Sequence, residues 1–123
     1  MARILVAEDE ASVREFVTRA LTHAGHEVVA VVDGLRALEA LHGDRFDLLI
    51  TDIVMPGMDG IALALKVTKD WPDLGVLLMT GYAAERQRAH NLEDLIHKVI
   101  AKPFSLAEFL AAVDEALAKA KRG

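Results

Sequence analysis

Residues 46–52 read Phe-Asp-Leu-Leu-Ile-Thr-Asp, an apolar run that stops on the carboxylate of Asp52. Three other short runs rich in Val, Ile and Leu also stop on chemically active side chains, namely residues 3–7 before Glu8 and Asp9, residues 76–79 before Thr80, and residues 99–101 before Lys102. Uninterrupted apolar runs of this length are typical of strands buried on both faces of a parallel sheet. The carboxyl ends of such strands open on one edge, where ligands bind. We therefore expect these polar groups to converge on a single site.

Helix-like segments separate the apolar runs, so strands and helices alternate. The strands are predicted at residues 2–7, 27–32, 46–51, 75–79 and 98–101, and the helices near residues 13–24, 35–43, 60–70, 83–91 and after 105. Gly25 is placed to end the first helix, and Ser105 with Glu108 predicts a capping box at the start of the last. The helical spacing also puts Leu35 and Leu65 on buried faces. This alternation predicts a doubly wound α/β sandwich with a parallel sheet.

The composition excludes several classes of protein. The 123 residues, 53% of them apolar, suffice for one domain with a substantial core. Without cysteine there is neither a disulfide framework nor a thiolate metal site. A net charge of −5 argues against a nucleic-acid partner. No signal peptide is recognisable, and no apolar stretch reaches the ~20 residues of a membrane span, so we expect a cytoplasmic protein without membrane insertion.

The acids at the strand ends suggest metal and nucleophile chemistry. Asp52 precedes an irregular loop rather than a helix, so its carboxylate is free to act as a nucleophile or a metal ligand. Glu8 and Asp9 bring two more carboxylates to the same edge, and like charges ~4 Å apart repel by about 4 kcal/mol at an effective dielectric of 20. A bound cation relieves that repulsion, and an all-oxygen ligand set suits Mg²⁺. Alternatively, Glu8 and Asp9 simply begin the first helix, where acids interact favourably with its dipole.

The other two strand ends offer groups that bind anions. Thr80 supplies a hydroxyl, Gly81 an amide that can approach an oxyanion closely, and Lys102 a positive charge suited to a phosphoryl group. Together with a carboxylate nucleophile and Mg²⁺, these groups form a set suited to phosphoryl transfer. We expect a cis peptide bond before Pro103, because a tight turn is needed to aim Lys102 inward.

Four motifs in this order resemble the receiver domains of bacterial response regulators. They are residues 4–10 (Ile-Leu-Val-Ala-Glu-Asp-Glu), 49–60 (Leu-Ile-Thr-Asp-Ile-Val-Met-Pro-Gly-Met-Asp-Gly), 78–81 (Leu-Met-Thr-Gly) and 101–104 (Ala-Lys-Pro-Phe). The resemblance implies a flavodoxin-like (βα)5 fold with strand order 2-1-3-4-5. It also implies that residues 1–123 form a single receiver domain without an output domain.

The resemblance assigns a role to each site residue. Asp52 would accept a phosphoryl group from a histidine kinase or a histidine phosphotransfer protein, in a self-catalysed transfer rather than as a turnover enzyme. The implied Mg²⁺ ligands are Asp9, Asp52 and the main-chain carbonyl of Val54, with Glu8 helping through water. Thr80, Gly81 and Lys102 would hold the phosphoryl oxygens, and Thr80 would report them by moving inward.

One position departs from the family pattern. Val99 stands three residues before Lys102, where receivers usually carry a Tyr or Phe that swings inward with Thr80. Tyr82 either replaces that moving ring or forms a static lid, because nothing in the sequence fixes its rotamer. Val54 and Tyr82 flank the implied phosphoryl entrance, so we expect them to tune how fast Asp52 gains and loses phosphate.

The segment after Tyr82 suggests a partner surface. Arg86, Arg88 and His90 form a basic patch on an acidic protein, and the patch is either a partner face or an ordinary solvated helix face. Residues 80–84 and 99–104 resemble CpdR-type regulators, whose unphosphorylated form assists delivery of substrates to the ClpXP protease, so ClpX is an implied partner. A phosphorelay carrier or a chemotaxis-type regulator is the alternative. A Mg²⁺-dependent phosphatase fits less well, because Val54 stands where such enzymes usually carry a second carboxylate.

Overall fold

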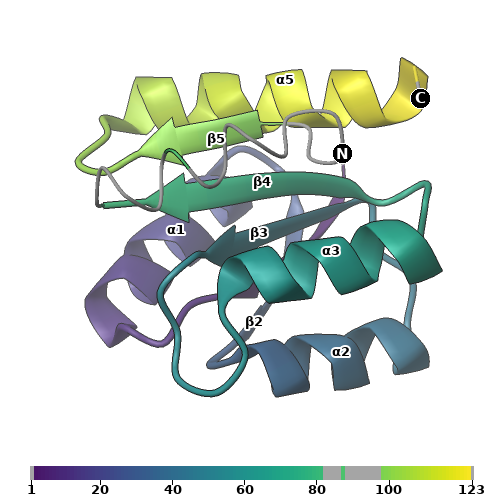
Figure 1. The fold of residues 1–123 in the computed structure, drawn as a ribbon. Helices are drawn as coiled ribbons and strands as arrows, with labels where there is room; N and C mark the ends of the chain where they lie inside the picture. Colours follow the sequence, from purple (N-terminus) through teal and green to yellow (C-terminus); the bar gives the residue numbers. More distant parts are fainter. Residues whose placement is uncertain (1, 82–86, 88–97, 123) are drawn as a thin grey trace.

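The computed structural model describes residues 2–81, 87 and 98–122. In chain order (Figure 1) its elements are β1 (Arg3–Ala7), α1 (Ala11–His23), β2 (Glu27–Val31), α2 (Gly34–Gly43), β3 (Leu48–Asp52), α3 (Gly60–Asp70), β4 (Gly75–Thr80), β5 (Lys98–Ala101) and α5 (Leu106–Arg122). From β1 to β4, and again from β5 to α5, strands and helices therefore alternate as the sequence predicts. The predicted helix over residues 83–91 lies outside the described residues.

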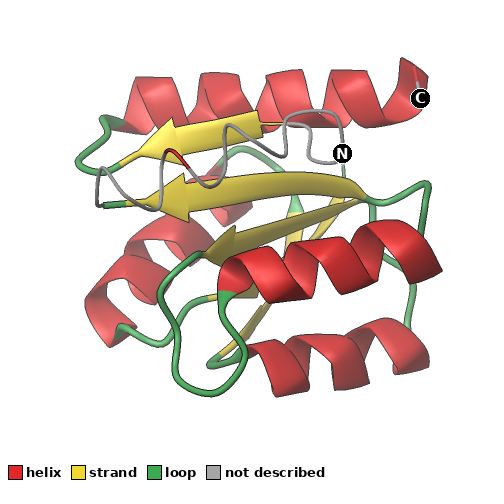
Figure 2. Ribbon diagram, viewed as in Figure 1, coloured by secondary structure: helices red, strands yellow, loops and turns green. Residues whose placement is uncertain are grey.

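The five strands form one parallel sheet in the order β2-β1-β3-β4-β5, which confirms the expected flavodoxin-like topology. All strand arrows point toward the same edge (Figure 2). Alternate residues of the central strands pack on opposite faces. Leu49 and Val76 belong to the core beneath α2 and α3, whereas Ile50 and Leu77 belong to the core beneath α1 and α5. Both faces of the sheet are thus covered, which explains why its strands are apolar without interruption.

Side chains at the helix starts fix where the helices begin. The carboxylates of Asp33 and Asp59 accept hydrogen bonds of 2.8 Å from the amides of Arg36 and Ala62, so both acids are N-caps. The last helix begins with the predicted capping box, in which Glu108 N donates to Ser105 Oγ at 3.1 Å and Ser105 N to Glu108 Oε1 at 3.0 Å. These caps satisfy amide groups that have no partner within a helix.

Two details of the core differ from the sequence-based expectation. Leu35 is 56% exposed and Leu65 41% exposed, so their assignment to buried faces is wrong. The buried stripe of α2 is Gly34, Ala37, Leu38 and Leu41, and that of α3 is Gly60, Ile61, Leu63, Ala64 and Val67. Each helix turns a narrow stripe to the sheet, and a leucine just beside that stripe is left in solvent. None of the helices in the described ranges is long and apolar enough to cross a membrane.

Candidate functional site

All strand arrows end at one edge of the sheet (Figure 2), and four of the polar residues singled out in the sequence lie at these carboxyl ends. Asp52 is the last residue of β3 and Thr80 the last residue of β4, while Glu8 directly follows β1 and Lys102 directly follows β5. The register places Asp52 beside Met79 and Thr80 beside Ala101, so the three strand ends are level. The parallel topology therefore brings together groups that are far apart in the sequence.

Three carboxylates meet at this edge. Glu8, Asp9 and Asp52 each offer an oxygen, and the three oxygens all lie within 4.8 Å of one another. Glu8 is fully buried, Asp52 is 8% exposed and Asp9 is exposed. Hard carboxylate oxygens in a compact group, one of them open to solvent, form a donor set suited to Mg²⁺, which keeps several waters and takes one or two carboxylates. The three predicted acids thus fit such an ion.

Lys102 reaches back over the acids. Its Nζ lies 2.8 Å from Oδ2 of Asp52 and 3.3 Å from Oε1 of Glu8, within hydrogen-bond reach of both. Burial alone would lower the pKa of the Lys102 ammonium group, but the hydrogen bond and charge of Asp52, together with the charge of Glu8, outweigh burial and raise it. Lys102 therefore stays charged at the site.

The buried carboxyl of Glu8 has a raised pKa. Its pKa is raised from 4.5 to about 7, chiefly by burial and also by the nearby charge of Asp52. The hydrogen bond from the Glu10 amide and the ammonium of Lys102 act in the opposite direction and only partly offset this rise. The Glu10 amide donates to Glu8 Oε2 at 3.1 Å. Among the described residues, Lys102 is the one cation that bonds to Glu8 and Asp52. Because the pKa of Glu8 is about 7, its carboxyl group can gain or lose a proton near neutral pH.

Thr80 and Gly81 lie next to Lys102 across the sheet edge. The Lys102 amide donates a hydrogen bond of 2.7 Å to the Thr80 carbonyl, and Thr80 is buried. A Cβ added to Gly81 would lie 4.0 Å from Cδ of Lys102, so this glycine flanks the lysine side chain. The peptide bond between Lys102 and Pro103 is cis, as predicted.

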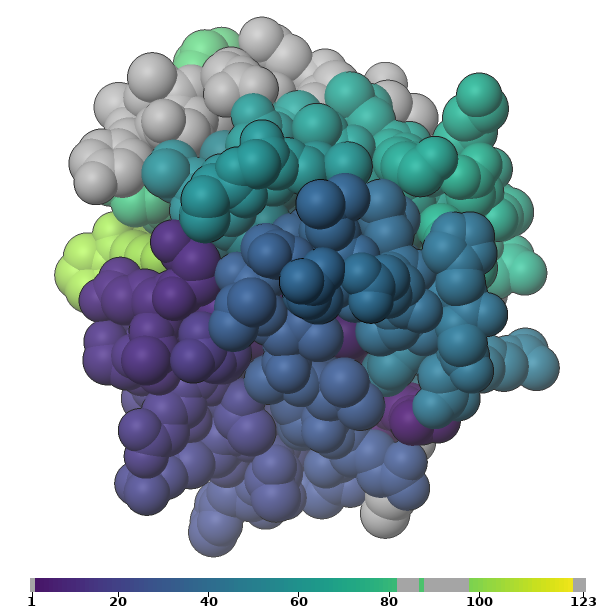
Figure 3. All heavy atoms as spheres, turned by 90° about the horizontal axis from the view of Figure 1, so that it is seen from below, coloured from purple at the N-terminus to yellow at the C-terminus, as the bar shows by residue number. Residues whose placement is uncertain are grey.

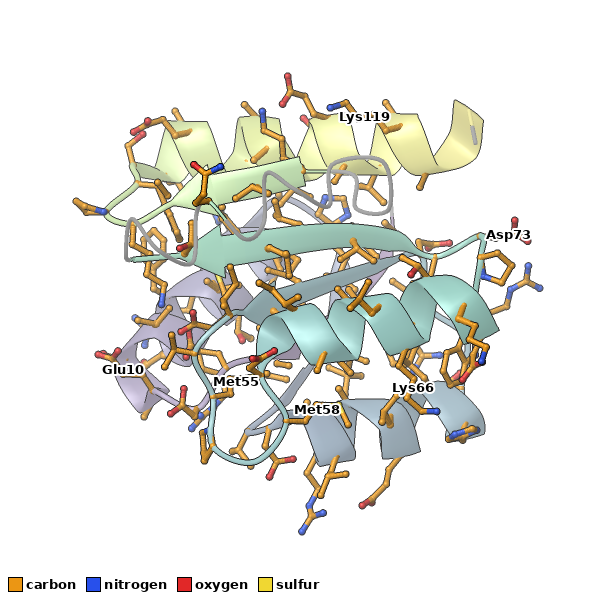
Figure 4. The ribbon with its side chains drawn as sticks, in the orientation of Figure 1. Glu10, Met55, Met58, Lys66, Asp73 and Lys119 are labelled. Carbon is orange, nitrogen blue, oxygen red and sulfur yellow. The ribbon has the colours of Figure 1, made fainter. Side chains whose placement is uncertain are left out.

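The loop from β3 to α3 is anchored by its methionines. Met55 is 7% exposed and packs into the core beneath α2 and α3, and Met58 lies against Gly34 at the start of α2. Figure 4 shows both side chains on this loop. Val54, two residues after Asp52 on the same loop, has a side chain that is 49% exposed.

Three phenylalanine rings form an aromatic cluster where the chain passes from β5 to α5. The rings of Phe104 and Phe109 stack with centroids 5.3 Å apart, and Phe16 on α1 lies 6.2 Å from Phe104. In the space-filling view, the residues after β5 lie beside the start of α1 (Figure 3), where a groove of about 330 Å³ is lined by Ser12, Val13, Phe16, Lys102, Pro103 and Phe104. The contact between the rings of Phe104 and Phe16 therefore holds Phe104 against α1.

Most of the predicted site residues come together. Glu8, Asp9, Asp52 and Lys102 form one cluster, with Thr80 and Gly81 beside it. Val99 instead packs, partly buried, against the core beneath α2 and α3. The remaining predicted residues, which are Tyr82, Arg86, Arg88 and His90, lie outside the described residues.

Sequence reasoning missed Arg14. Its Nη1 donates to the main-chain carbonyls of Glu8 at 2.8 Å and Asp9 at 3.4 Å, so this residue holds the backbone that carries two of the acids. A basic residue in the first turn of α1, where acids are usually favoured, was the available signal.

Comparison with known proteins gives one consistent family. The model of the response regulator receiver domain matches residues 4–114. The response regulator receiver protein CpdR of Brucella abortus is 41% identical over 117 residues, which cover 95% of this chain and 98% of CpdR. The response regulator MprA of Mycobacterium ulcerans is 34% identical, and the match covers 97% of this chain and 51% of MprA, so the chain spans about half the length of that relative. The solved structure of the response regulator TrrA of Thermotoga maritima, in complex with Mg²⁺ and BeF, has a TM-score of 0.85 at 30% identity and covers 94% of this chain and 99% of TrrA.

Proposed function

This chain belongs to the response regulator receiver domain family, and we propose that Asp52 accepts its phosphoryl group. The observation that carries the proposal is the meeting of Asp52 with Glu8, Asp9 and Lys102 at one sheet edge. Asp52 is 8% exposed, so its carboxylate is partly desolvated yet reachable from solvent. The donor would be the phosphohistidine of a histidine kinase or of a histidine phosphotransfer protein.

Mg²⁺ is the cofactor that fits the acidic cluster. Asp9 and Asp52 would hold it with the main-chain carbonyl of Val54, and Glu8 would assist through water. The ion would neutralise charge on the phosphoryl oxygens. The structure of the relative TrrA with Mg²⁺ and BeF supports this assignment.

The transfer itself needs a nucleophile and a charge partner. An oxygen of Asp52 attacks phosphorus, the bond from phosphorus to the donor's imidazole nitrogen breaks, and the electron pair stays on that nitrogen, which takes up a proton from water. The product is an acyl phosphate on Asp52. The ammonium of Lys102, already 2.8 Å from Asp52, is placed to pair with the added negative charge. The neighbouring Thr80 hydroxyl and Gly81 amide would bind the remaining phosphoryl oxygens.

The chain acts as a switch rather than as a turnover enzyme. A phosphatase with an aspartate nucleophile usually places an acid two residues later to protonate its leaving group. That position here is Val54, an apolar residue with an exposed side chain, so rapid turnover lacks its proton donor. Phosphorylation and its reversal on Asp52 would therefore be slow and stoichiometric.

Signalling by this receiver would pass through a protein partner in the cytoplasm. The relationship to CpdR over nearly all of both chains favours a CpdR-like adaptor, which in its unphosphorylated form engages ClpX of the ClpXP protease. Addition of a phosphoryl group with about two negative charges at Asp52 would end that engagement. The alternative is a phosphorelay carrier or a chemotaxis-type regulator, and an experiment must distinguish it from the CpdR-like adaptor.

Labelling with radioactive acetyl phosphate and Mg²⁺ tests the phosphoryl acceptor. We expect one phosphoryl group per chain in the wild type and none in Asp52→Asn. Asp73→Asn is the matched control, because Asp73 is exposed and lies at the opposite end of the molecule from Glu10 (Figure 4). Full labelling of Asp52→Asn, or many turnovers per chain, would contradict the proposal.

Capture with purified ClpX tests the partner. We expect the unphosphorylated protein to bind ClpX and the beryllofluoride-treated protein to lose that binding. Equal capture of both forms, or capture only of a histidine phosphotransfer protein, would favour the phosphorelay alternative.

A further inference from the structure

The backbone of Asp52 is pressed by the first residue of α3. A Cβ added to Gly60 would overlap the carbonyl oxygen of Asp52 and would lie 2.8 Å from both its carbonyl carbon and Cα of Ile53. Real Cβ atoms essentially never approach closer than 3.0 Å, and the obstructing atoms are backbone atoms that cannot simply rotate away. The Gly60 amide also donates a 2.8 Å hydrogen bond to the Ile53 carbonyl. Only glycine lets α3 begin this close to the end of β3.

The same carbonyl is held by a buried hydroxyl. Thr51 Oγ1 lies 3.0 Å from the carbonyl oxygen of Asp52, to which it donates, and Thr51 is fully buried. The other end of the same peptide unit is fixed as well, because Ile53 N donates to the Met79 carbonyl at 3.1 Å. The peptide unit between Asp52 and Ile53, which directly follows the Cα that carries the Asp52 side chain, is therefore held by Thr51 and Met79 and packed against Gly60.

We propose that Thr51 and Gly60 are positioning residues for the chemistry at Asp52, which deepens and rests on the proposed function. Neither Thr51 nor Gly60 is among the acids and the lysine that would touch Mg²⁺ or the phosphoryl group. They act by fixing the peptide plane from which the Asp52 carboxylate projects toward Lys102, 2.8 Å away. They also set where the loop with Val54 leaves the strand. Preorganised geometry of this kind is sensitive, since a displacement of ~1 Å at a reacting group can lower its rate about 100-fold.

Gly60→Ala tests the packing contact, with Gly43→Ala as its matched control. Gly43 is the last residue of α2, and a Cβ added there meets nothing within 4 Å. Mg²⁺ affinity is measured by calorimetry on protein shown by circular dichroism to be folded, followed by the labelling rate with acetyl phosphate. We expect Gly60→Ala to bind Mg²⁺ at least about tenfold more weakly and to label about 100-fold more slowly. Gly43→Ala should match the wild type.

Thr51→Val and Thr51→Ser test the hydroxyl, and they carry the test alone if Gly60→Ala does not fold. Valine keeps the branched shape of the threonine side chain but removes its hydroxyl donor, whereas serine keeps the hydroxyl donor. We expect Mg²⁺ affinity and labelling rate to fall about threefold to tenfold in Thr51→Val, the loss of one neutral hydrogen bond, and to recover in Thr51→Ser. In metal-free protein, the amide of Ile53 should exchange faster with solvent in Thr51→Val than in Thr51→Ser.

The outcomes separate this inference from the proposed function. A wild type that takes no label on Asp52 overturns the proposed function, and the inference falls with it. A wild type that is labelled, beside folded Gly60→Ala and Thr51→Val proteins that only lose stability and keep wild-type Mg²⁺ affinity and labelling rate, overturns the positioning role alone.

Discussion

Lys102 Nζ donates to Asp52 Oδ2 at 2.8 Å and lies 3.3 Å from Glu8 Oε1, so one ammonium group is shared by two buried acids. The side chain of Lys102 is 23% exposed, that of Asp52 is 11% exposed and that of Glu8 is 0% exposed. In such a partly desolvated place, each charge depends strongly on its neighbours. A change in the lysine therefore acts on both acids together.

Replacement of Lys102 by methionine should separate metal binding from phosphoryl transfer. We expect Mg²⁺ to bind about threefold to tenfold more tightly, because a competing positive charge beside the acids is gone. Labelling of Asp52 by acetyl phosphate should slow by at least about tenfold, because the incoming phosphoryl group loses its charge partner. Calorimetry and the labelling rate measure the two effects.

The control for this lysine is Lys66→Met, which removes an exposed cation paired with Asp70 on α3 (Figure 4). It should leave both quantities unchanged. Weaker Mg²⁺ binding in Lys102→Met would mean that the lysine organises the acids instead of competing with the ion.

Glu8 should make stability depend on pH in the absence of Mg²⁺. Its pKa is about 7 in the folded protein against 4.5 ordinarily, so between these values the folded state holds the proton that the unfolded state has released. The free energy of unfolding therefore falls as pH rises from 4.5 to 7, by about 3 kcal/mol from this residue. Urea unfolding in a chelator at pH 5 and pH 8 measures the fall, and Lys102 stays charged across this window.

Glu8→Gln is the comparison protein, since glutamine cannot titrate. We expect its unfolding free energy to fall less between pH 5 and pH 8 than that of the wild type. Equal falls in both proteins would show that Glu8 is already ionised at pH 5. Mg²⁺ affinity of the wild type should rise over the same range, because metal ligands must lose their protons.

The capping box of α5 should contribute measurably to stability. Ser105→Ala removes the hydroxyl that accepts from the Glu108 amide at 3.1 Å, and we expect a loss of about 1 kcal/mol in urea unfolding. Ser12→Ala is the control, because the Ser12 hydroxyl donates to the exposed carboxylate of Glu10. A loss no larger in Ser105→Ala than in Ser12→Ala would contradict the assignment.

Two apolar residues of α5 should differ sharply in their effect on stability. Phe109 is fully buried and stacks on Phe104, so Phe109→Ala should cost about 3–5 kcal/mol. Leu106 is 47% exposed, and Leu106→Ala should change the unfolding free energy by no more than about 0.5 kcal/mol. Similar losses in both variants would mean that the aromatic cluster is loosely packed.

The sequence pattern predicted the parallel α/β sandwich and the site edge because the same apolar runs encode both, whereas the strand order followed only from the family resemblance. An apolar run that ends on Asp52, Glu8 or Lys102 marks a buried parallel strand and also the edge at which strands open. Residue-level packing was harder to foresee. Leu35 and Leu65 have helical spacing, yet whether a leucine at the border of a buried stripe is covered depends on how the helix rolls on the sheet.

The contacts that Thr51 and Gly60 make with the Asp52 carbonyl could not be inferred from motifs. Thr51 is polar within an apolar strand, and nothing in the sequence says that its hydroxyl donates to the next carbonyl. Gly60 gave a weak signal, because glycine inside the first turn of a helix is unfavourable unless backbone approaches closely. Its contact with Asp52 is set by how α3 docks, which is a tertiary property.

The contact between Glu8 and Lys102 joins residues 94 positions apart, and that between Asp52 and Lys102 spans 50. A chain still emerging from the ribosome therefore carries its acids long before their cation arrives. The cluster is completed last, when β5 docks beside β4, so a copy that ends before Lys102 holds its buried acids without the cation that bonds to them.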